Sequence, residues 1–489
     1  MKNSFPKRFL AAALLAVTVL AALTACVTVG PNEGDTSEIT QGATEEVTKS
    51  YKPKNVPDDL NYDGREFTVM TFGETTVVWF DVDWSAVEET AEDINDGVYR
   101  RTARVESELG IKVVPELGGV KGSGEPLKKS VLANDSLYDI AFINVRSAGA
   151  LSQEECLYDL HDLDQLEIEA EWWDQNCVKD MSIYNMLFML TGDIEIMYKK
   201  SIGVTLFNKV MAKDYQLPDL YELVDDKEWT IYKIAEYGFD VSEDINNDDK
   251  WTKDDTYGYL FYSDVSALGV IAAEASFCEK NEDDLPEITF FSDRTVEALD
   301  AWFEVLLNGT LSYSDNNENV LKPMFINGQA LFDYNEFHAV EQLRQMETDF
   351  GILPIPMLDE DQEGYHHSIN PHVGSVMVVP YDNDDLEFTA WVTDSLGAAS
   401  KNILTPKYYD AYLKWKSTRD DESKDVIDLI LATIRYDLGY MYDYGGLSDL
   451  TLRMTQSKKT NVASEYTKIE SAAQDALEKA IDKYFALDF

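Results

Sequence analysis

The stretch EFTVMTF, residues 66–72, alternates polar and apolar residues before Gly73, a pattern typical of a β-strand that ends in a turn. Apolar residues then recur at helical spacing from Val87 to Leu109, and Gly110 ends the predicted helix. Strands are predicted over 111–115 and 138–144, with a short helix over 127–132 between them. This strand and helix alternation is the rhythm of a doubly wound sheet, so the region predicts an α/β fold.

The same rhythm resumes further along the chain. A strand is predicted over 202–208, a helix over 231–239 with Thr230 as its N-cap, and a second helix over 296–307. A helix end that turns into a strand follows at 325–332, then strands over 351–356 and 375–380 and an Ala-rich helix over 464–484. About 430 residues are too many for one hydrophobic core, so we expect two domains.

The N-terminus has the pattern of an export signal. Lys2, Lys7 and Arg8 precede an apolar run of 17 residues over 9–25, which ends in LTA before Cys26. A cysteine after small residues resembles the lipobox of bacterial lipoproteins, in which the thiol is lipidated and becomes the new N-terminus. We therefore expect residues 1–25 to be a signal peptide. The alternative, an uncleaved transmembrane helix, is disfavoured because 17 residues are short for a bilayer core of ~30 Å.

The lipidated Cys26 and the residues up to 61 are expected to form a disordered tether, because this segment is rich in Thr, Glu, Gly and Pro without an apolar period. The remaining cysteines, Cys156, Cys177 and Cys278, allow at most one intramolecular disulfide. A Cys156–Cys177 bridge and unpaired buried thiols both remain open. Neither would be the main support of a fold of this size.

The charge of the chain excludes some partners. The sequence has 41 Lys and Arg against 91 Asp and Glu, a formal net charge of −50. Such a field repels nucleic acid and anionic lipid surfaces, so we expect no nucleic-acid partner and no membrane contact except through a lipid anchor.

Several stretches, in this order, resemble one family: the extracellular solute-binding proteins (family 1) of ABC importers, the sugar-binding lipoproteins related to maltose-binding protein. Besides the lipobox, the matching stretches are INDGVYRR at 94–101, YDIAF at 138–142, LTGD at 190–193, FINGQALF at 325–332, DFGILPIP at 349–356 and the region 408–440. No single piece is highly specific, and their shared order carries the resemblance.

The resemblance implies a two-lobed, type II periplasmic-binding-protein-like fold, with two doubly wound lobes joined by a multi-strand hinge. Lobe 1 would comprise residues 62–198 and 375–400, and lobe 2 residues 199–374 and 401–489, with a crossing near 194–200. A ligand would bind between the lobes and favour their closed form, which a membrane permease then recognises. The protein would be an extracellular, membrane-anchored monomer and not an enzyme.

A sugar offers an apolar ring face and a belt of hydroxyls, so its site needs aromatic platforms and polar groups. Residues that follow predicted strands are Glu74, Trp79, Trp84, Asn144 and Arg146. The family pattern adds Asp193, Asn335, Glu336 and Phe337, and a Gly-flanked run adds Tyr440 and Tyr442. For each aromatic residue, ordinary core packing is the alternative.

A calcium loop is predicted over 244–255, DINNDDKWTKDD. The ligands would be Asp244, Asn246, Asp248, the Lys250 carbonyl, Thr252 and Asp255, at positions 1, 3, 5, 7, 9 and 12 of a helix–loop–helix calcium site. Asp249 stands where such a loop prefers glycine, and Asp255 is shorter than the usual glutamate. A structural Ca²⁺ and a merely solvated acidic loop are both open.

Motifs of common enzyme classes are missing from the sequence: it has no G-x-S-x-G elbow, Walker-type phosphate loop or G-x-G-x-x-G fingerprint. No catalytic cofactor is expected. We favour a sugar-binding importer component that binds a sugar or oligosaccharide. The alternatives are a secreted, calcium-stabilised glycoside-active enzyme and a surface glycan-binding adhesion module.

Overall fold

A computed structural model describes residues 50–73, 84, 86–315, 317–343, 346–414 and 421–487. The chain from Ser50 onward forms one compact unit. The predicted signal peptide, Cys26 and most of the predicted tether lie outside the described residues. Among the helices within the described ranges, none is long and apolar enough to cross a membrane.

The first sheet has four strands in the order β11-β3-β1-β2. They are β1 (Arg65–Thr71), β2 (Ile111–Leu117), β3 (Ile140–Asn144) and β11 (Ser375–Val378). β1 is parallel to both β2 and β3, and β11 is antiparallel to β3. This sheet and its helices are called the first lobe. Those helices are α1 (Asp93–Leu109), α2 (Glu125–Ala133), α3 (Val145–Ser152), α4 (Gln175–Met181) and α13 (Leu386–Lys414).

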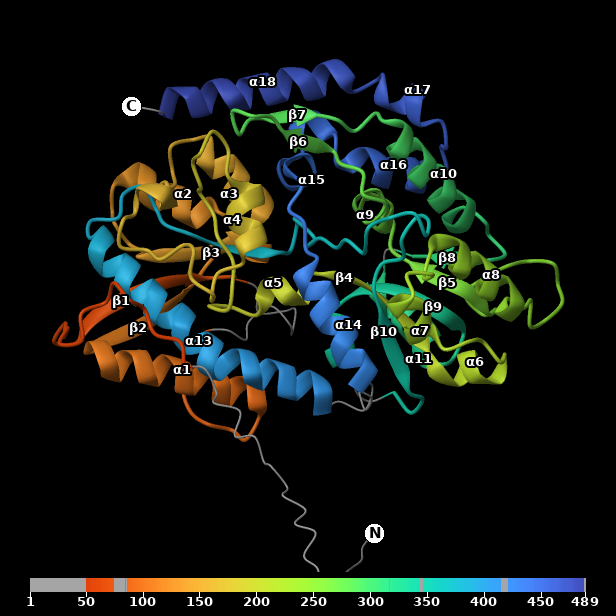
Figure 1. Ribbon diagram of the computed structural model, residues 1–489, viewed down its shortest axis with the longest axis horizontal. Helices are drawn as coiled ribbons and strands as arrows, with labels where there is room; N and C mark the ends of the chain where they lie inside the picture. The colour runs from red at the N-terminus through yellow and green to blue at the C-terminus, as the bar shows by residue number, and fades with distance from the viewer. Residues whose placement is uncertain are drawn as a thin grey trace, which may run out of the picture. The chain divides into compact units, whose positions relative to one another are not determined.

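The long helix α1 shows how the sequence pattern becomes structure. Its buried face carries Val98, Val105 and Leu109 and packs along α13, as Figure 1 shows. The helix begins later than predicted, because Ala91 adopts a left-handed φ of +67° and Val87 is 87% exposed. Gly110 ends it with φ +63°, where a Cβ would lie 2.2 Å from the Asn61 amide oxygen.

The second sheet has five strands in the order β10-β4-β9-β5-β8. They are β4 (Gly203–Asn208), β5 (Tyr257–Phe261), β8 (Ser312–Ser314), β9 (Ala330–Glu336) and β10 (Phe350–Leu353). β5, β8 and β9 are mutually parallel, and β4 runs against its neighbours β9 and β10. This sheet and its helices are called the second lobe. Those helices are α6 (Lys209–Asp214), α7 (Leu220–Asp225), α8 (Ile231–Val241), α9 (Val265–Ala272), α10 (Asp293–Leu306), α11 (Glu318–Ile326) and α12 (His338–Gln342).

The sequence pattern located α8 and α10 well, with one error in detail. Thr230 precedes α8, but its hydroxyl makes no capping hydrogen bond. Thr230 instead forms a β-bridge with Met357, so its extended backbone connects the start of α8 to the segment that follows β10. The helix is held by its buried face, which includes Ile231, Ile234 and Val241.

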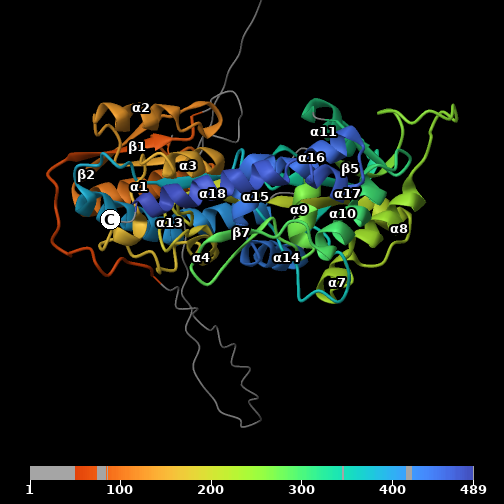
Figure 2. The ribbon, with the colours of Figure 1, turned by 90° about the horizontal axis from the view of Figure 1, so that it is seen from above.

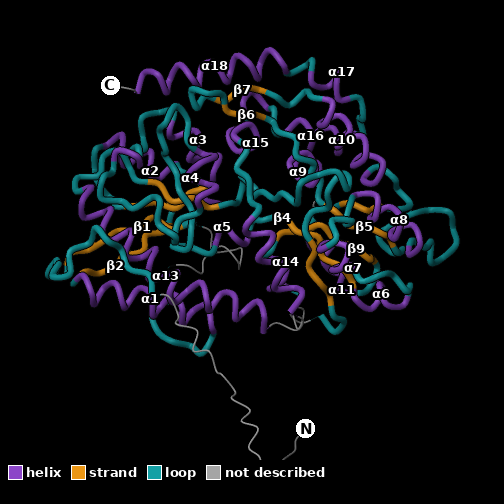
Figure 3. The backbone as a smooth tube through the Cα atoms, viewed as in Figure 1, coloured by secondary structure: helices purple, strands orange, loops and turns teal. Residues whose placement is uncertain are grey.

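Within the described residues, the chain passes between the sheets more than once. Helix α5 (Met197–Lys200) leads to Ile202, which bridges Ile369, and His367 of the same return segment bridges Ile434. The tube in Figure 3 shows two groups of strands separated by these crossings. Two α/β lobes joined by these crossings confirm the predicted fold class.

The C-terminal helices contact both lobes. They are α14 (Asp421–Ala432), α15 (Leu438–Tyr442), α16 (Asp449–Ser457), α17 (Val462–Tyr466) and α18 (Glu470–Leu487). Helix α14 packs on α7 and β10 of the second lobe, and α16 packs on α9 and α10 there. Helix α15 packs on α3 of the first lobe and on β6 (Cys278–Lys280), which pairs with β7 (Pro286–Ile288). Seen from above in Figure 2, α15 and α18 lie over the junction of the lobes.

The three described cysteines, Cys156, Cys177 and Cys278, are unpaired and buried. Of the two states left open by the sequence, the structure therefore has free thiols. Burial raises the pKa of each thiol above its ordinary value. Across the described residues, the fold is therefore held by its apolar cores without a disulfide.

Candidate ligand-binding site

Polar side chains from both lobes meet where β3, β5 and β9 end. This set is called the inter-lobe cluster and contains Arg146, Asp264, Glu336, Asn370, Asp443, Ser448 and Asp449. The carboxyl ends of strands are the usual binding edge of an open α/β sheet. Arg146 and Glu336 are the predicted ligand-binding residues that the structure brings into this cluster.

Arg146 lies in the first turn of α3, directly after β3. One terminal nitrogen, Nη2, donates to the hydroxyl of Ser448. The guanidinium also lies 3.6 Å from the Asp443 carboxylate and 3.8 Å from that of Asp449. Its Nε and Nη1 atoms are buried without a hydrogen-bond partner among the described residues. Arg146 therefore joins the first lobe to the C-terminal segment and keeps N–H donors for another acceptor.

The second lobe contributes a buried carboxyl, Glu336, and a half-buried one, Asp264, which are joined by one amide. Asn370, on the return crossing, donates from Nδ2 to Glu336 Oε1 at 2.8 Å and to Asp264 Oδ2 at 3.4 Å. The Tyr334 hydroxyl also donates to Asp264, at 3.3 Å. These contacts couple the ends of β5 and β9 to the hinge, so a ligand that touches this pair touches the crossing as well.

The electrostatics of the cluster are strongly perturbed. Burial, followed by the charge of Glu336, raises the pKa of Asp264 to about 7. On the neighbouring strand, burial raises the pKa of Asp333 to about 8. The Asp449 pKa is lowered, first by His372, whose ring nitrogen lies 3.9 Å from the carboxylate, and further by Arg146, against the effect of its burial. Carboxyls with pKa values pushed apart in a buried cluster are typical of a functional site.

The other predicted polar residues near the cluster serve the local fold. The Asn144 side chain caps α3, accepting from Ser147 N at 2.8 Å, and donates to the Lys121 carbonyl. Asn335 donates to Asp333 and accepts from the backbone N–H of Glu336. Phe337 is 2% exposed and precedes α12. These residues fix the backbone at the strand ends, next to Arg146 and Glu336.

The predicted aromatic platforms that the structure describes are packed inside the protein. Trp84 is 8% exposed, lies 5.2 Å from the Phe142 ring and carries the Arg101 guanidinium over its face. Tyr442 stacks on Tyr444, and its ring fills the space where a Cβ on Gly149 would stand, 2.9 Å away. Both therefore follow the core-packing alternative.

Of the predicted aromatic residues that the structure describes, Tyr440 lies nearest to the inter-lobe cluster. Its ring stacks on Phe277 of the second lobe. Its pKa is raised by burial and then by the charges of Asp264 and Glu336, while the charge of Arg146 opposes the shift. Tyr440 thus adjoins the inter-lobe cluster. Glu74 and Trp79, the remaining predicted residues, lie outside the described residues.

Asp193 has a different setting from the one the family pattern suggested. Its Oδ1 accepts from Lys199 Nζ at 2.9 Å and from Thr405 Oγ1 at 2.8 Å, and its Oδ2 accepts from Lys401 Nζ at 3.0 Å. Both carboxylate oxygens are occupied by protein donors, and the residue is 8% exposed. Asp193 therefore ties the first crossing to α13.

The predicted calcium loop is tightly folded. Asp249 N donates to Asp244 Oδ2 at 2.8 Å, and Asp249 has φ +60°, the conformation for which such loops use glycine. Asp244 Oδ1 is buried without a hydrogen-bond partner among the described residues. Asp255 is 1% exposed and accepts from Ile245 N and Thr252 N.

The remaining predicted calcium ligands are arranged in successive turns. Asn246 accepts from Asp248 N, and Asp248 accepts from Lys250 N. Within the described ranges, no group of three or more His, Cys, Asp or Glu side chains is arranged to hold a metal. The backbone at Asp249 thus fits a calcium loop, while the Asp255 carboxylate is committed to backbone donors. Calcium binding stays a prediction.

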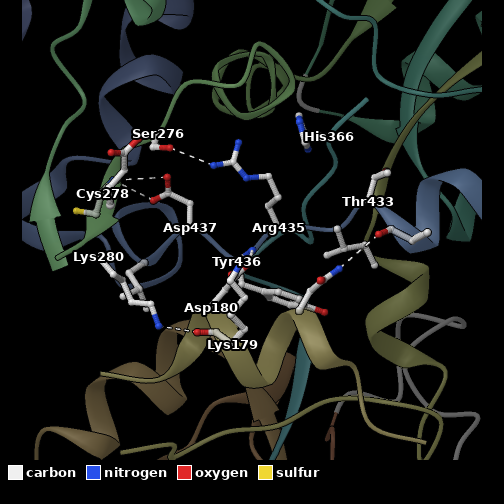
Figure 4. Close-up of a pocket in the computed structure, with 15 residues that line it drawn as sticks. Lys179, Asp180, Ser276, Cys278, Lys280, His366, Thr433, Arg435, Tyr436 and Asp437 are labelled. Atoms are coloured by element: carbon white, nitrogen blue, oxygen red, sulfur yellow. Dashed lines mark hydrogen bonds between the residues drawn. The ribbon is translucent and has the colours of Figure 1, made fainter. Parts of the chain in front are cut away.

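A second space at the lobe junction is a pocket of about 620 Å³, shown in Figure 4. Its walls are α4, β6, His366 and the crossing segment 432–438. The Asp437 carboxylate accepts from Phe277 N at 2.7 Å and Cys278 N at 3.2 Å, and Lys280 donates to the Lys179 carbonyl across the lobes. These charged groups are satisfied by the protein itself. We therefore place the candidate site at the inter-lobe cluster and not at this pocket.

Comparison with known proteins supports the fold. UgpB from Mycobacterium tuberculosis, solved with glycerophosphocholine, has a TM-score of 0.59 at 13% identity, over 86% of this chain and 100% of that chain. A cyclic α-maltosyl-1,6-maltose binding protein from Arthrobacter globiformis has a TM-score of 0.55 at 14% identity, over 86% and 98%. An ABC substrate-binding protein from Listeria monocytogenes, solved with cycloalternan, has a TM-score of 0.52 at 13% identity, over 87% and 100%.

No protein-family model matches the chain, and no curated protein matches it in sequence. At such low identity the structural similarity establishes the fold alone. In its fold, the chain therefore confirms the resemblance that the sequence motifs indicated.

Sequence reasoning missed several members of the inter-lobe cluster. Asp264 follows the strand β5, and the rule that strand ends carry ligand-binding residues would have found it. Asn370, Asp443, Ser448 and Asp449 had no such signal, because their place depends on how the return crossing and the C-terminal helices pack.

Proposed function

We propose that this protein is the substrate-binding component of an ABC-type importer and that it binds a sugar or oligosaccharide between its lobes without altering it. The observation that carries the proposal is the inter-lobe cluster: Arg146 from one lobe and Glu336 from the other converge at strand ends, with buried N–H donors left over on Arg146. Two of the similar structures carry names of sugar ligands, cycloalternan and cyclic maltosyl-maltose, which agrees with this ligand class.

A ligand would act on this fold by contacting both lobes together. The Arg146 donors would bind hydroxyl oxygens, and the carboxylate of Glu336 would accept from hydroxyl protons. Because Asn370 connects Glu336 and Asp264 to a crossing, ligand contacts there favour one hinge arrangement over others. The ligand stabilises the closed form only by the difference in its affinity for the two arrangements. A permease that recognises the closed form would then receive the sugar.

The location and assembly of the protein belong to the same proposal. Cleavage before Cys26 and lipidation of its thiol would anchor a monomer to the outer face of the cell membrane, with residues 26–61 as a tether. The predicted lobe boundary at residue 400 falls inside α13 (Leu386–Lys414), a helix of the first lobe. Lobe 1 would therefore comprise residues 62–198 and 375–414, and lobe 2 residues 199–374 with much of the remainder. The high negative charge supports the absence of nucleic-acid partners. The acidic loop over 244–255 would hold a structural Ca²⁺ in lobe 2.

The proposal is tested by thermal unfolding of the protein with a panel of mono- and oligosaccharides. A ligand that binds only the folded state raises the melting temperature, by an amount equivalent to about 2.7 kcal/mol when present at a hundred times its dissociation constant. Arg146→Ala should reduce the shift strongly, because the contact from the first lobe is lost. Arg104→Ala, at an exposed arginine that pairs with Glu108 on α1, should leave it intact.

The same experiment separates the alternatives. Chromatography of the incubated sugar should show no product, whereas cleavage of the sugar would make the protein a glycoside-active enzyme. A shift of wild-type size in Arg146→Ala would place sugar binding outside the inter-lobe cluster, as expected of an adhesion module. If no saccharide in the panel shifts the transition, the proposed ligand class is wrong.

A further inference from the structure

A pocket of about 540 Å³ runs along the edge of the second lobe. It follows strand β8, the outermost strand of the five-stranded sheet, and is closed by the C-terminal ends of α10 and α16. Figure 1 shows these three elements on the same side of the molecule, and α10 contacts both of the others. The pocket is called the Trp251 pocket after the aromatic residue at its mouth.

Aromatic rings form one wall of the Trp251 pocket. The Trp251 ring lies 5.5 Å from that of Tyr257, which lies 5.2 Å from that of Tyr313. Tyr257 is 1% exposed, whereas Trp251 and Tyr313 are half-buried and line the pocket. A buried ring therefore supports two partly exposed ones, which is how a protein presents flat apolar surface to a ligand.

The position of Trp251 is fixed by contacts on its C-terminal side. The Tyr257 hydroxyl donates to the Thr252 carbonyl at 2.9 Å, and the buried Asp255 carboxylate accepts from Thr252 N at 2.7 Å. These bonds hold the backbone next to Trp251 against the sheet. A platform held in this way loses little conformational entropy when a ligand stacks on it.

The pocket also has polar lining residues. Ser312 is 6% exposed, and its hydroxyl is buried without a hydrogen-bond partner among the described residues. Such an atom costs free energy unless a ligand or water satisfies it. Asp315, Gln456 and Lys458 also line the pocket and provide both donors and acceptors.

We propose that the Trp251 pocket is a second saccharide-binding site, which takes one pyranose ring of a neutral oligosaccharide. The apolar face of the ring would stack on Trp251 and Tyr313, and its hydroxyls would bond to Ser312, Asp315 and Lys458. The pairing of flat rings with groups of both charge signs suits a neutral polyol, and the net charge of −50 opposes anionic ligands. This site does not depend on Arg146 and stands whether or not the inter-lobe cluster binds a sugar.

The test is calorimetric titration of the full chain with gluco-oligosaccharides, in the wild type and in the Arg146→Ala background. Saturable binding, weaker than in the wild type, should remain in Arg146→Ala. Trp251→Ala in that background should weaken it about fivefold or more, the loss expected for one stacked ring, whereas Trp251→Phe should retain most of it. Tyr232→Ala, at an exposed aromatic residue on α8, is the matched control and should change nothing.

Far-UV circular dichroism and the melting temperature establish that each variant is folded. If Trp251→Ala unfolds the protein, Ser312→Val and Lys458→Met test the polar wall instead and should each weaken the residual binding. Absence of binding in Arg146→Ala, or equal binding with and without the Trp251 ring, overturns the proposal.

Discussion

Replacement of Asp193 by asparagine tests how the first crossing is held. The carboxylate bridges Lys199 of α5, Thr405 and Lys401 of α13, at 2.8–3.0 Å. Asp193→Asn keeps the size of the side chain and an acceptor for Thr405 but removes the negative charge. It leaves the Lys199 ammonium, whose side chain is 5% exposed, without its counter-charge.

The expected loss of stability follows from this burial. Removing one partner of a fully buried ion pair costs about 3–5 kcal/mol, because the remaining charge stays desolvated. The Lys401 side chain is 23% exposed and gains hydration when released, so we expect a value near the lower end, about 3 kcal/mol. Burial acts to raise the pKa of Asp193, but Lys199 and Lys401 outweigh it and hold the pKa below its ordinary value.

The sign of the pH dependence follows from that shift. A carboxyl whose pKa is lower in the folded state stabilises the protein above the unfolded pKa, near 3.9, and loses this contribution as the pH falls through the folded value. The difference between wild type and Asp193→Asn should therefore be full at pH 7 and shrink below pH ~4.

The assay is urea unfolding followed by circular dichroism at several pH values. Asp58→Asn, at an exposed carboxyl paired with Lys52, is the control and should leave the midpoint unchanged. If Asp193→Asn has the stability of the wild type but loses saccharide binding, the structural role is refuted and Asp193 acts on the ligand.

Three further predictions address other parts of the molecule. Chelation with EDTA should lower the melting temperature of the wild type, and added calcium should restore it. Asp244→Ala should remove both effects. If calcium does not change the melting temperature of the wild type, the predicted calcium loop is wrong. Burial raises the pKa of Asp333 to about 8, so the free energy of unfolding should fall as the pH rises from about 4 to 8 and the buried carboxyl loses its proton. In urea titrations Asp333→Asn should flatten this dependence of the unfolding free energy on pH. An unchanged dependence would show that Asp333 is not buried as described. The thiols of Cys156, Cys177 and Cys278 should react with a thiol reagent only after unfolding, and rapid labelling of the native protein would contradict their burial.

The fold could be predicted from sequence to a large extent, because it rests on local patterns. The strand over 66–72, the helix over 296–307 and the helix-to-strand turn at 325–332 all appear within a few residues of their predicted bounds. Periodic burial fixes such elements wherever they lie in the chain. The start of α1 was missed because the left-handed turn at Ala91 leaves no mark in the apolar spacing.

The candidate site could be predicted only in part. Arg146 was found because it follows a predicted strand, Glu336 was found through the family pattern, and both lie in the inter-lobe cluster. The aromatic residues were less predictable, because a tryptophan in a core and one in a cleft have the same sequence signature; Trp84 is an example of the former. Trp251 was read only as part of the acidic loop, although its ring lines a pocket formed with α16 some 200 residues away in the chain.

The most direct test of the central claim is hydrogen–deuterium exchange of the protein with and without a saccharide that raises its melting temperature. The account predicts slower exchange in four segments at once: the start of α3 with Arg146, the end of β9 with Glu336, the return crossing at Asn370, and the turn before α16 with Asp443. Protection confined to one lobe, or none at these segments despite saturation, would contradict binding between the lobes.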